Sequence, residues 1–167
     1  MGEKTDRNLY ASFVGEAKAY FRLLAYAEEA EGEGLPQIAA LFRAVAEAER
    51  IHATRALRLL GEAVVKDTEN NLRASFEREE TASGVFYPRF IQEAEAEGEG
   101  QAVTSFSYAR DVEEGHAALY RRALQHMLAE TAPVYHVCLV CGYIAEGNAP
   151  DRCPICNAPR ERFRHIT

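Results

Sequence analysis

The sequence has no long apolar run. No stretch reaches the roughly 20 apolar residues that a helix needs to cross a lipid bilayer. The first residues also lack the charged start and apolar block that are typical of a secretory signal peptide. We therefore expect a cytoplasmic protein without a membrane partner.

An excess of positive charge is also missing. The net charge is −7, and it is unevenly divided along the chain. Residues 1–132 carry 15 basic and 23 acidic side chains, a net of −8, whereas residues 133–167 carry 4 basic and 3 acidic ones, a net of +1. Nucleic acid is excluded as a partner because its binding requires a basic face. Most of the glutamates are expected on solvated helix surfaces.

The sequence has no cysteine outside two Cys-x-x-Cys pairs. The pairs are Cys138 with Cys141 and Cys153 with Cys156. In a reducing compartment this arrangement indicates a metal site rather than disulfides. Four sulfurs on a tetrahedron suit iron or zinc, and the spacing alone leaves an iron centre and a structural zinc ribbon open. Gly142 and Asn157 follow the pairs and tolerate the left-handed conformation of a tight turn.

Residues 5–130 are rich in Ala, Leu, Glu and Arg, which favour helices. Four segments place apolar residues at alternating steps of three and four, the pattern of a helix bundle. Breaks fall at residues 31–36, 61–68 and 97–100, and residues 131–133 end the fourth segment. We predict an all-α four-helix bundle over residues 1–131, followed by a small four-cysteine metal-binding domain over residues 132–167.

The helical region contains an internal repeat. Three motifs recur: Ser12-Phe13-x-x-Glu16 as Ser75-Phe76-x-x-Glu79, residues 30–34 as residues 96–100, and Glu49-x-x-His52 as Glu113-x-x-His116. The first motif recurs after 63 residues and the last after 64. This pattern predicts two helical hairpins related by a pseudo-two-fold axis, with a longer crossover between them.

Four glutamates occupy apolar positions of the helical pattern: Glu16, Glu49, Glu79 and Glu113. An unpaired ionised carboxylate in a core is very costly. Two of these glutamates have a histidine three residues later, His52 and His116, on the same helix face. One Glu from each of two helices, with Glu-x-x-His from each of the other two, is the ligand set of di-iron and di-manganese carboxylate proteins. Two divalent cations would neutralise the four carboxylates. The remaining histidines, His126, His136 and His165, have no such context and are interpreted as ordinary.

These motifs together resemble the rubrerythrin family, in which a ferritin-like four-helix domain precedes a short rubredoxin domain. The resemblance covers nearly the whole chain. It rests on Phe13-Val14-Gly15-Glu16, Glu49-Arg50-Ile51-His52, Glu113-Glu114-Gly115-His116, Tyr135-x-x-Cys138 through Cys156, and Ala158-Pro159-x-x-x-Phe163. The resemblance implies two iron ions in the helical bundle and one iron, or zinc, at the four cysteines.

The third helix departs from the family pattern. Rubrerythrins usually carry Glu-x-x-Glu a few residues before a Tyr-Pro pair, and counting back from Tyr87 gives Glu79 and then Ala82. Glu77-x-x-Glu80 has the right spacing but needs a shift of two residues, so Glu79 is preferred because it lies on the apolar stripe. Glu80 is a possible extra ligand. In the family the missing Glu is associated with an iron that changes ligand between redox states.

A second departure concerns tyrosine. The tyrosine that the family places seven residues after the first glutamate is Leu23 in this sequence. Tyr20 or Tyr87 could take its place beside the metal ligands.

The resemblance implies reduction of hydrogen peroxide to water, as a defence against oxidative stress. Electrons would pass through the rubredoxin iron from a separate NAD(P)H-dependent rubredoxin reductase, since the chain has no Gly-rich dinucleotide loop. A homodimer is implied because in this family the rubredoxin of one subunit typically approaches the di-iron site of another.

Two other functions stay open. The first is a ferroxidase or iron-handling protein that reacts with dioxygen, which Ala82 favours. The second is a redox or metal sensor in which the cysteines form a structural zinc ribbon.

Overall fold

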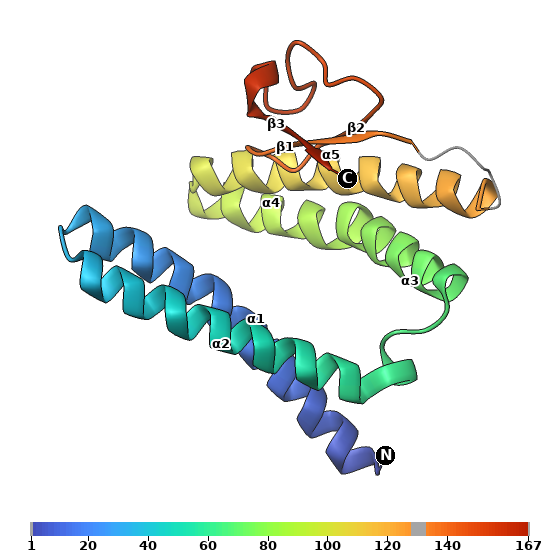
Figure 1. The fold of residues 1–167 in the computed structure, drawn as a ribbon. Helices are drawn as coiled ribbons and strands as arrows, with labels where there is room; N and C mark the ends of the chain where they lie inside the picture. The colour runs from blue at the N-terminus through green and yellow to red at the C-terminus, as the bar shows by residue number, and fades with distance from the viewer. Residues whose placement is uncertain (1, 128–132, 167) are drawn as a thin grey trace. The chain divides into compact units, whose positions relative to one another are not determined.

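A computed structural model of the chain describes residues 2–127 and 133–166. The predicted boundary between the domains, at residues 131 and 132, lies outside the described residues. The chain divides into two compact units, Met1–Asp67 and Thr68–Thr167. The first unit is a helical hairpin, and the second combines another helical hairpin with a small sheet (Figure 1).

The helices follow the predicted breaks. In the first unit they are α1 (Glu3–Gly32), α2 (Pro36–Leu60) and the short 3-10 helix η1 (Gly61–Ala63). In the second they are α3 (Thr68–Thr81), the π-helix η2 (Ala82–Phe86), α4 (Tyr87–Glu97) and α5 (Gly100–Gln125). The four predicted helical segments are thus present, although α5 ends at Gln125, before the break predicted at residues 131–133.

The third predicted segment is not one regular helix. A π-helical segment separates α3 from α4, and the N–H of Tyr87 bonds to the carbonyl of Ala82, five residues back. A π turn holds one residue more than an α turn, and such turns occur mostly as single insertions within α-helices. The third predicted segment is therefore helical, with a π-helical stretch at Ala82–Phe86.

The hairpin of α1 and α2 is packed through alanines. Ala27, Ala30 and Ala39 are buried together, with Phe42 packed against them. Along α2 the other buried residues are Ala46, Ala53, Ala56 and Leu60. Small side chains allow the two helix axes to approach closely, and an ion pair of 2.7 Å between Arg43 and Glu31 joins the helices near their turn.

The two hairpin turns have the same geometry but use different glycines of the repeated sequence. In the first hairpin Gly34 has a φ of +75°, its N–H bonds to the carbonyl of Glu31, and the next N–H bonds to Ala30. In the second, Gly98 has a φ of +77° and the same two bonds reach Glu95 and Ala94. This is the Schellman ending of a helix, which glycine accommodates without a Cβ clash. Gly98, however, corresponds in the repeat to Gly32 and not to Gly34.

The small sheet of the second unit has three antiparallel strands in the order β2-β1-β3. They are β1 (Tyr135–Cys138), β2 (Ile144–Glu146) and β3 (Phe163–Ile166), and the 3-10 helix η3 (Arg160–Arg162) leads into β3. Side chains alternate between the two faces of a strand. One face carries Cys138 and Phe163, which belong to the core around the cysteines.

The other face of the sheet is turned towards α5. Tyr135, Val137, Ile144 and Ile166 line an apolar cavity whose opposite wall includes Leu119, Tyr120 and Ala123 of α5. An ion pair of 2.6 Å between Arg122 and Glu146 adds a polar contact at the same junction. The small domain is therefore held against the helix that carries His116.

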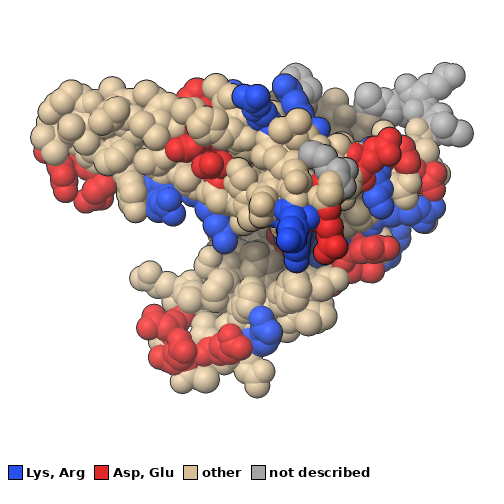
Figure 2. Space-filling view, turned by 90° about the horizontal axis from the view of Figure 1, so that it is seen from below, with Lys and Arg blue, Asp and Glu red and all other residues tan. Residues whose placement is uncertain are grey.

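Charged side chains of both signs are interspersed over the face seen in Figure 2, without one dominant basic patch. This distribution agrees with the acidic balance of the sequence. Within residues 2–127 and 133–166, none of the helices combines the length and the apolar character that a membrane span requires.

Candidate metal centres

The first hairpin brings together three of the predicted ligands. Glu16 of α1 and Glu49 and His52 of α2 each offer one ligand atom, and these atoms lie within 4.8 Å of one another. His52 Nδ1 lies 2.9 Å from Glu49 Oε2, as the spacing of three residues on one helix face predicts.

The second hairpin repeats this group. Glu79 of α3 and Glu113 and His116 of α5 also place their ligand atoms within 4.8 Å of one another. His116 Nδ1 lies 2.9 Å from Glu113 Oε2, the same distance as in the first hairpin. The sequence repeat thus corresponds to two groups of two carboxylates and one imidazole.

The chemistry of the second group calls for a cation. His116 Nε2 lies 3.2 Å from the carbonyl oxygen of Gly142, and a carbonyl can only accept a hydrogen bond, so Nε2 carries the proton and donates it. In the neutral ring Nδ1 is then left with its lone pair towards Glu113 Oε2. A proton on Nδ1, which makes the ring an imidazolium, or a metal ion bound to both atoms satisfies this contact. A divalent metal ion fits this donor set.

The carboxylate of Glu79 also favours a bound cation. Burial, a hydrogen bond to Glu113 and the negative charge of Glu113 together raise the pKa of Glu79 to about 7. Two carboxylates this close share a proton when no other cation is present. A bound metal ion would replace that proton and leave both groups ionised.

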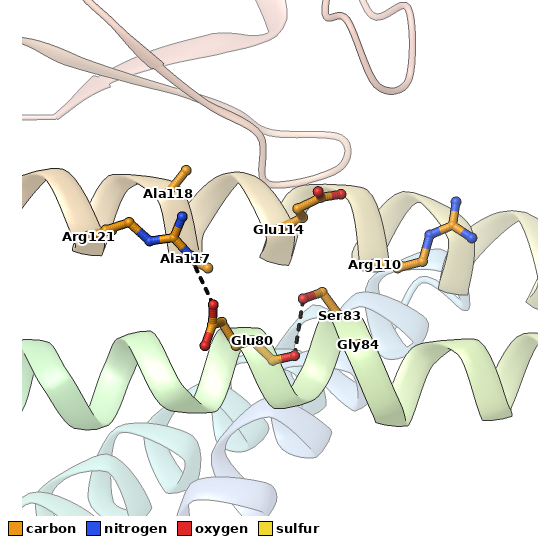
Figure 3. Close-up of a pocket in the computed structure, with 8 residues that line it drawn as sticks. All are labelled: Glu80, Ser83, Gly84, Arg110, Glu114, Ala117, Ala118 and Arg121. Atoms are coloured by element: carbon orange, nitrogen blue, oxygen red, sulfur yellow. Dashed lines mark hydrogen bonds and ion pairs between the residues drawn. The ribbon is translucent and has the colours of Figure 1, made fainter.

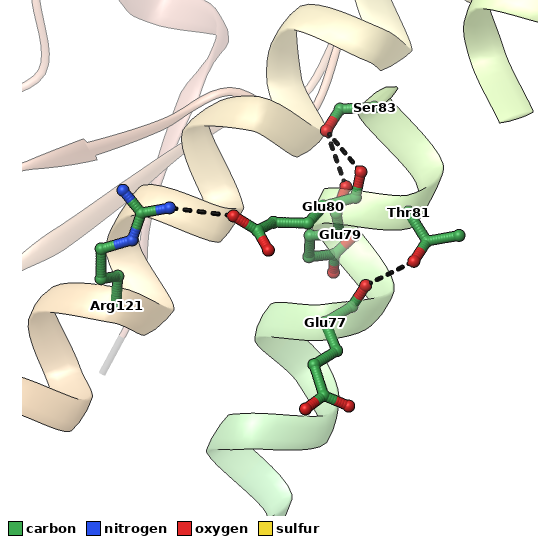
Figure 4. Close-up of polar contacts among 6 residues, drawn as sticks. All are labelled: Glu77, Glu79, Glu80, Thr81, Ser83 and Arg121. Atoms are coloured by element: carbon green, nitrogen blue, oxygen red, sulfur yellow. Dashed lines mark hydrogen bonds and ion pairs between the residues drawn. The ribbon is translucent and has the colours of Figure 1, made fainter. Parts of the chain in front are cut away.

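Glu80 is directed elsewhere. Its carboxylate forms an ion pair of 2.9 Å with Arg121 of α5, and it lines an open pocket together with Arg110 and Glu114 (Figure 3). Figure 4 shows Glu80 extending towards Arg121, whereas Glu77 lies about a turn earlier on α3. The structure therefore brings Glu79, and not Glu80, into the group with Glu113. Ala82 is the first residue of the π-helix.

Tyr87 faces the second group. Burial raises the pKa of the Tyr87 phenol, and the negative charges of Glu113 and Glu79 act in the same direction. The hydroxyl is thus protonated over the physiological pH range. Its ring packs with those of Phe90 and Phe106, which fixes its place at the start of α4.

The four cysteines form a compact cage. Cys138 Sγ lies 3.7 Å from Cys156 Sγ, and Cys141 Sγ lies 3.5 Å from Cys153 Sγ. A tetrahedral site with metal–sulfur bonds of about 2.3 Å has sulfurs about 3.8 Å apart, so the cage has the size that iron or zinc needs. All four thiols are free of disulfides.

The turns after the cysteine pairs have the expected conformation. Gly142 has a φ of +87° and Asn157 a φ of +61°, the only positive φ of a non-glycine residue in the described part of the chain. The N–H groups of Gly142 and Asn157 bond back to the carbonyls of Cys138 and Cys153 at 2.9 Å. The prediction of a left-handed residue after each pair is confirmed.

Backbone N–H groups point at the sulfurs. Burial acts to raise the pKa of the Cys138 thiol, but the N–H groups of Cys141 and Val140 bond to its sulfur and hold the pKa below its ordinary value. Burial raises the pKa of both Cys141 and Cys156, although an N–H group opposes it in each case. A metal cation would stabilise all four thiolates at once.

The link between His116 and Gly142 was not visible in the sequence. The two residues are 26 positions apart, and no spacing rule connects a helix to the turn of a distant metal site. The carbonyl belongs to the residue directly after Cys141. The imidazole of His116 therefore contacts Glu113 in one candidate centre and the turn beside Cys141 in the other.

Comparisons with known proteins agree with this arrangement. The family model described as Rubrerythrin matches residues 7–124, and the one described as the rubredoxin-like domain of rubrerythrin matches residues 136–164. Nigerythrin of Nitratidesulfovibrio vulgaris is 34% identical, with 95% of this chain and 85% of that protein covered. Rubrerythrin-1 of Clostridium acetobutylicum is 32% identical, with 99% and 96% covered.

Solved structures give the same answer. Nigerythrin in a mixed-valence state matches with a TM-score of 0.57 at 34% identity, over 99% of this chain and 88% of that one. Another match is the fully reduced, all-ferrous state of nigerythrin, with the same TM-score and coverage.

The fold and the two ligand sets define a ferritin-like helical protein with a four-cysteine rubredoxin-like domain. The chain belongs to the rubrerythrin family. Membership indicates an oxidoreductase that uses iron. The residues for a di-iron centre and for a four-thiolate centre are both present.

Proposed function

We propose that this protein is a non-haem di-iron peroxidase that reduces hydrogen peroxide to water. The observation that supports it is His116, whose Nδ1 faces Glu113 and whose Nε2 bonds to the carbonyl of Gly142, beside Cys141. An enzyme that relays single electrons between two centres needs a short covalent or hydrogen-bonded route. Iron bound on the Nδ1 side of this imidazole and the hydrogen bond on its Nε2 side would provide such a route.

The residues that would hold the two iron ions of the helical region are Glu16, Glu49 and His52 in the first unit and Glu79, Glu113 and His116 in the second. The third iron is held by Cys138, Cys141, Cys153 and Cys156. Iron bound at the helical residues would supply the two electrons that, with two protons, convert hydrogen peroxide into two water molecules, and iron at the four cysteines would return these electrons one at a time.

The protein supplies orientation and hydrogen bonds. Donation from Nε2 to Gly142 fixes the ring of His116, so that Nδ1 faces the metal position and cannot turn away. Tyr87 keeps its hydroxyl proton because of its burial beside Glu113 and Glu79. This hydroxyl can donate a hydrogen bond to a peroxide oxygen at the site, which stabilises the charge that develops as the O–O bond breaks.

The organisation and partners are part of the same proposal. We assign the ferritin-like di-iron domain to residues 1–131 and the rubredoxin-like domain to residues 132–167. An NAD(P)H-dependent rubredoxin reductase as electron donor and a homodimer both rest on the family resemblance, and the contact of His116 with Gly142, which lies within one chain, gives no support to the dimer. The cytoplasmic location expected from the sequence stays a prediction.

The test is an anaerobic single turnover. The fully iron-loaded protein is reduced, mixed with one equivalent of hydrogen peroxide, and followed through the visible spectrum of the oxidised cysteine-bound iron. Rapid return of that spectrum is expected. No return, with iron confirmed in both sites, would overturn the proposal. A Cys141→Ser variant is the control that separates oxidation of the cysteine-bound iron from that of the helical site.

A second candidate function is that of a ferroxidase, and Ala82 is the observation that favours it. The carboxylate that the family uses at this position is missing, and Glu80 is paired with Arg121 instead. Steady oxidation of added Fe(II) by dioxygen, without any reductant, would support this function. Restoring the carboxylate with Ala82→Glu should then shift reactivity from dioxygen towards peroxide, whereas a peroxidase already active with Ala82 should change little.

A further inference from the structure

Two histidines that seemed ordinary in the sequence lie opposite each other in the small sheet. His136 of β1 is the direct cross-strand partner of His165 of β3. The N–H of Leu139 bonds to the carbonyl of Arg162, and hydrogen-bonded pairs alternate along an antiparallel ladder. Counting three positions from Leu139 makes His136 and His165 a non-hydrogen-bonded pair, the type in which opposing side chains lie closest.

The two rings are within reach of one ion. Their centroids are 5.2 Å apart and their planes are inclined by 34°. Two imidazole nitrogens on one metal, each at about 2.0–2.1 Å, can be at most about 4.2 Å apart. His165 is exposed, so its side chain has room to rotate towards that separation.

His136 has a fixed ring with a free lone pair. Its Nδ1 lies 2.7 Å from the carbonyl oxygen of Gly147, which can only accept, so Nδ1 carries the proton. The carbonyl is itself held in place, because the N–H of Gly147 bonds to Val134 at 2.8 Å. In the neutral ring Nε2 is then the unprotonated nitrogen. A backbone carbonyl that orients the ring through the other nitrogen is the usual support of a metal-binding histidine.

We propose that His136 and His165 form a surface chelate for a divalent transition metal of the nickel, copper and zinc group. Imidazole pairs bind these ions, whereas magnesium and calcium prefer oxygen ligands. Water molecules complete the coordination. His136 and His165 share a sheet face with Cys138 and Phe163, but neither histidine belongs to the buried core around the cysteines. A bound ion would connect β1 to β3, which is an edge strand of the sheet.

The test uses the full-length, untagged protein with iron in its other sites, and Ni²⁺ as the probe. Competition with a chromophoric chelator measures affinity and stoichiometry. One Ni²⁺ per chain is expected. His136→Asn and His165→Asn should each weaken binding at least about tenfold, because a chelate needs both rings. His126→Asn is the matched control, an exposed histidine outside the sheet, and should leave binding unchanged.

Two further readouts guard against misfolded variants. The visible spectrum of the cysteine-bound iron shows whether the small domain is intact in each variant. Added Ni²⁺ should raise the temperature at which the wild-type loses that spectrum, because an ion that binds only the folded sheet stabilises it. Mg²⁺ should neither bind to the histidine pair nor raise this temperature. Equal binding in the wild-type and both sheet variants, or an equal loss in His126→Asn, would overturn the proposal.

Discussion

The two helical hairpins present the same set of ligands, two glutamates and one histidine, but they differ in how many residues separate these ligands from the turn. In the first, Glu16 lies 18 residues before the left-handed glycine of the turn, Gly34, and Glu49 lies 15 after it. In the second, Glu79 lies 19 residues before Gly98, and Glu113 lies 15 after it. The distance from the first glutamate to the turn glycine is therefore one residue longer in the second hairpin, in the segment that contains the π-helix.

This difference explains the π-helix. One extra residue in an α-helix rotates everything before it by about 100°, since a turn takes 3.6 residues. A π turn bonds to the carbonyl five residues back and so accommodates the extra residue locally. Glu79 consequently keeps the same relation to Glu113 that Glu16 has to Glu49. The comparison teaches that the duplicated ligand geometry is preserved although the helix length is not.

Single-residue deletions should break the comparison most strongly. Deleting Phe21 from α1 rotates Glu16 away from Glu49 and His52, and we expect iron binding at least about 100-fold weaker, the upper end of what losing one supporting partner costs. Deleting Gly84 from the π-helix should restore a regular helix and retain both irons. Iron per chain and Fe(II) titration measure the effect. Equal losses in the two deletions would contradict the explanation.

The two histidines should differ in electron transfer. His116→Gln and His52→Gln each remove one proposed iron ligand, but only His116 also bonds to the turn beside Cys141. At saturating iron, the oxidation of the cysteine-bound iron after peroxide addition should slow about tenfold more in His116→Gln than in His52→Gln, a difference of about 1.4 kcal/mol in the barrier. Anaerobic stopped-flow spectroscopy measures both rates.

Replacing the four turn glycines by alanine should change the free energy of unfolding in opposite directions within each pair of repeat counterparts. Gly34→Ala and Gly98→Ala place a Cβ at positive φ and should each lower the free energy of unfolding by about 1–2 kcal/mol. Their repeat counterparts Gly100 and Gly32 lie in helices, so Gly32→Ala should raise it by about 0.5–1 kcal/mol and Gly100→Ala by less. Chemical denaturation measures all four. A matched response of Gly32 and Gly98 would show that the turns use equivalent glycines after all.

The smallest effect should come from the ion pair between the second hairpin and the small domain. Arg122 and Glu146 are each more than a third exposed, so Arg122→Ala should cost only about 0.2–1 kcal/mol. The change should shrink further in high salt, because surface ion pairs are screened. The control is Arg121→Ala. Arg121 lies on the same helix as Arg122, but it pairs with Glu80 of α3. A large, salt-independent cost for Arg122→Ala would mean that its aliphatic stem, and not its charge, holds the domain.

Periodicity was enough to predict the four helical segments and the faces that carry the glutamates, since those signals repeat over many turns. The choice of Glu79 over Glu77 followed from the same stripe, and the structure places Glu79 with Glu113. The cysteine spacing likewise predicted the turn conformations at Gly142 and Asn157.

Features that depend on hydrogen bonds between distant or alternative partners were not predictable. Both copies of the repeated turn sequence offer two glycines, and nothing in the pattern indicates that Gly34 is used in one and Gly98 in the other. The π-helix follows from that choice, so it was missed as well. The contacts of His116 with Gly142 and of His136 with His165 join elements whose relative register the sequence does not encode.

The cage of four sulfurs has one more consequence. Its spacing suits zinc as well as iron, because both ions take tetrahedral thiolate ligands at similar distances. Geometry therefore does not select the ion, and its supply during folding does. Two preparations of the same chain, one from iron-rich and one from zinc-rich growth, would share a fold while one is red and the other colourless, and only the red one could pass an electron.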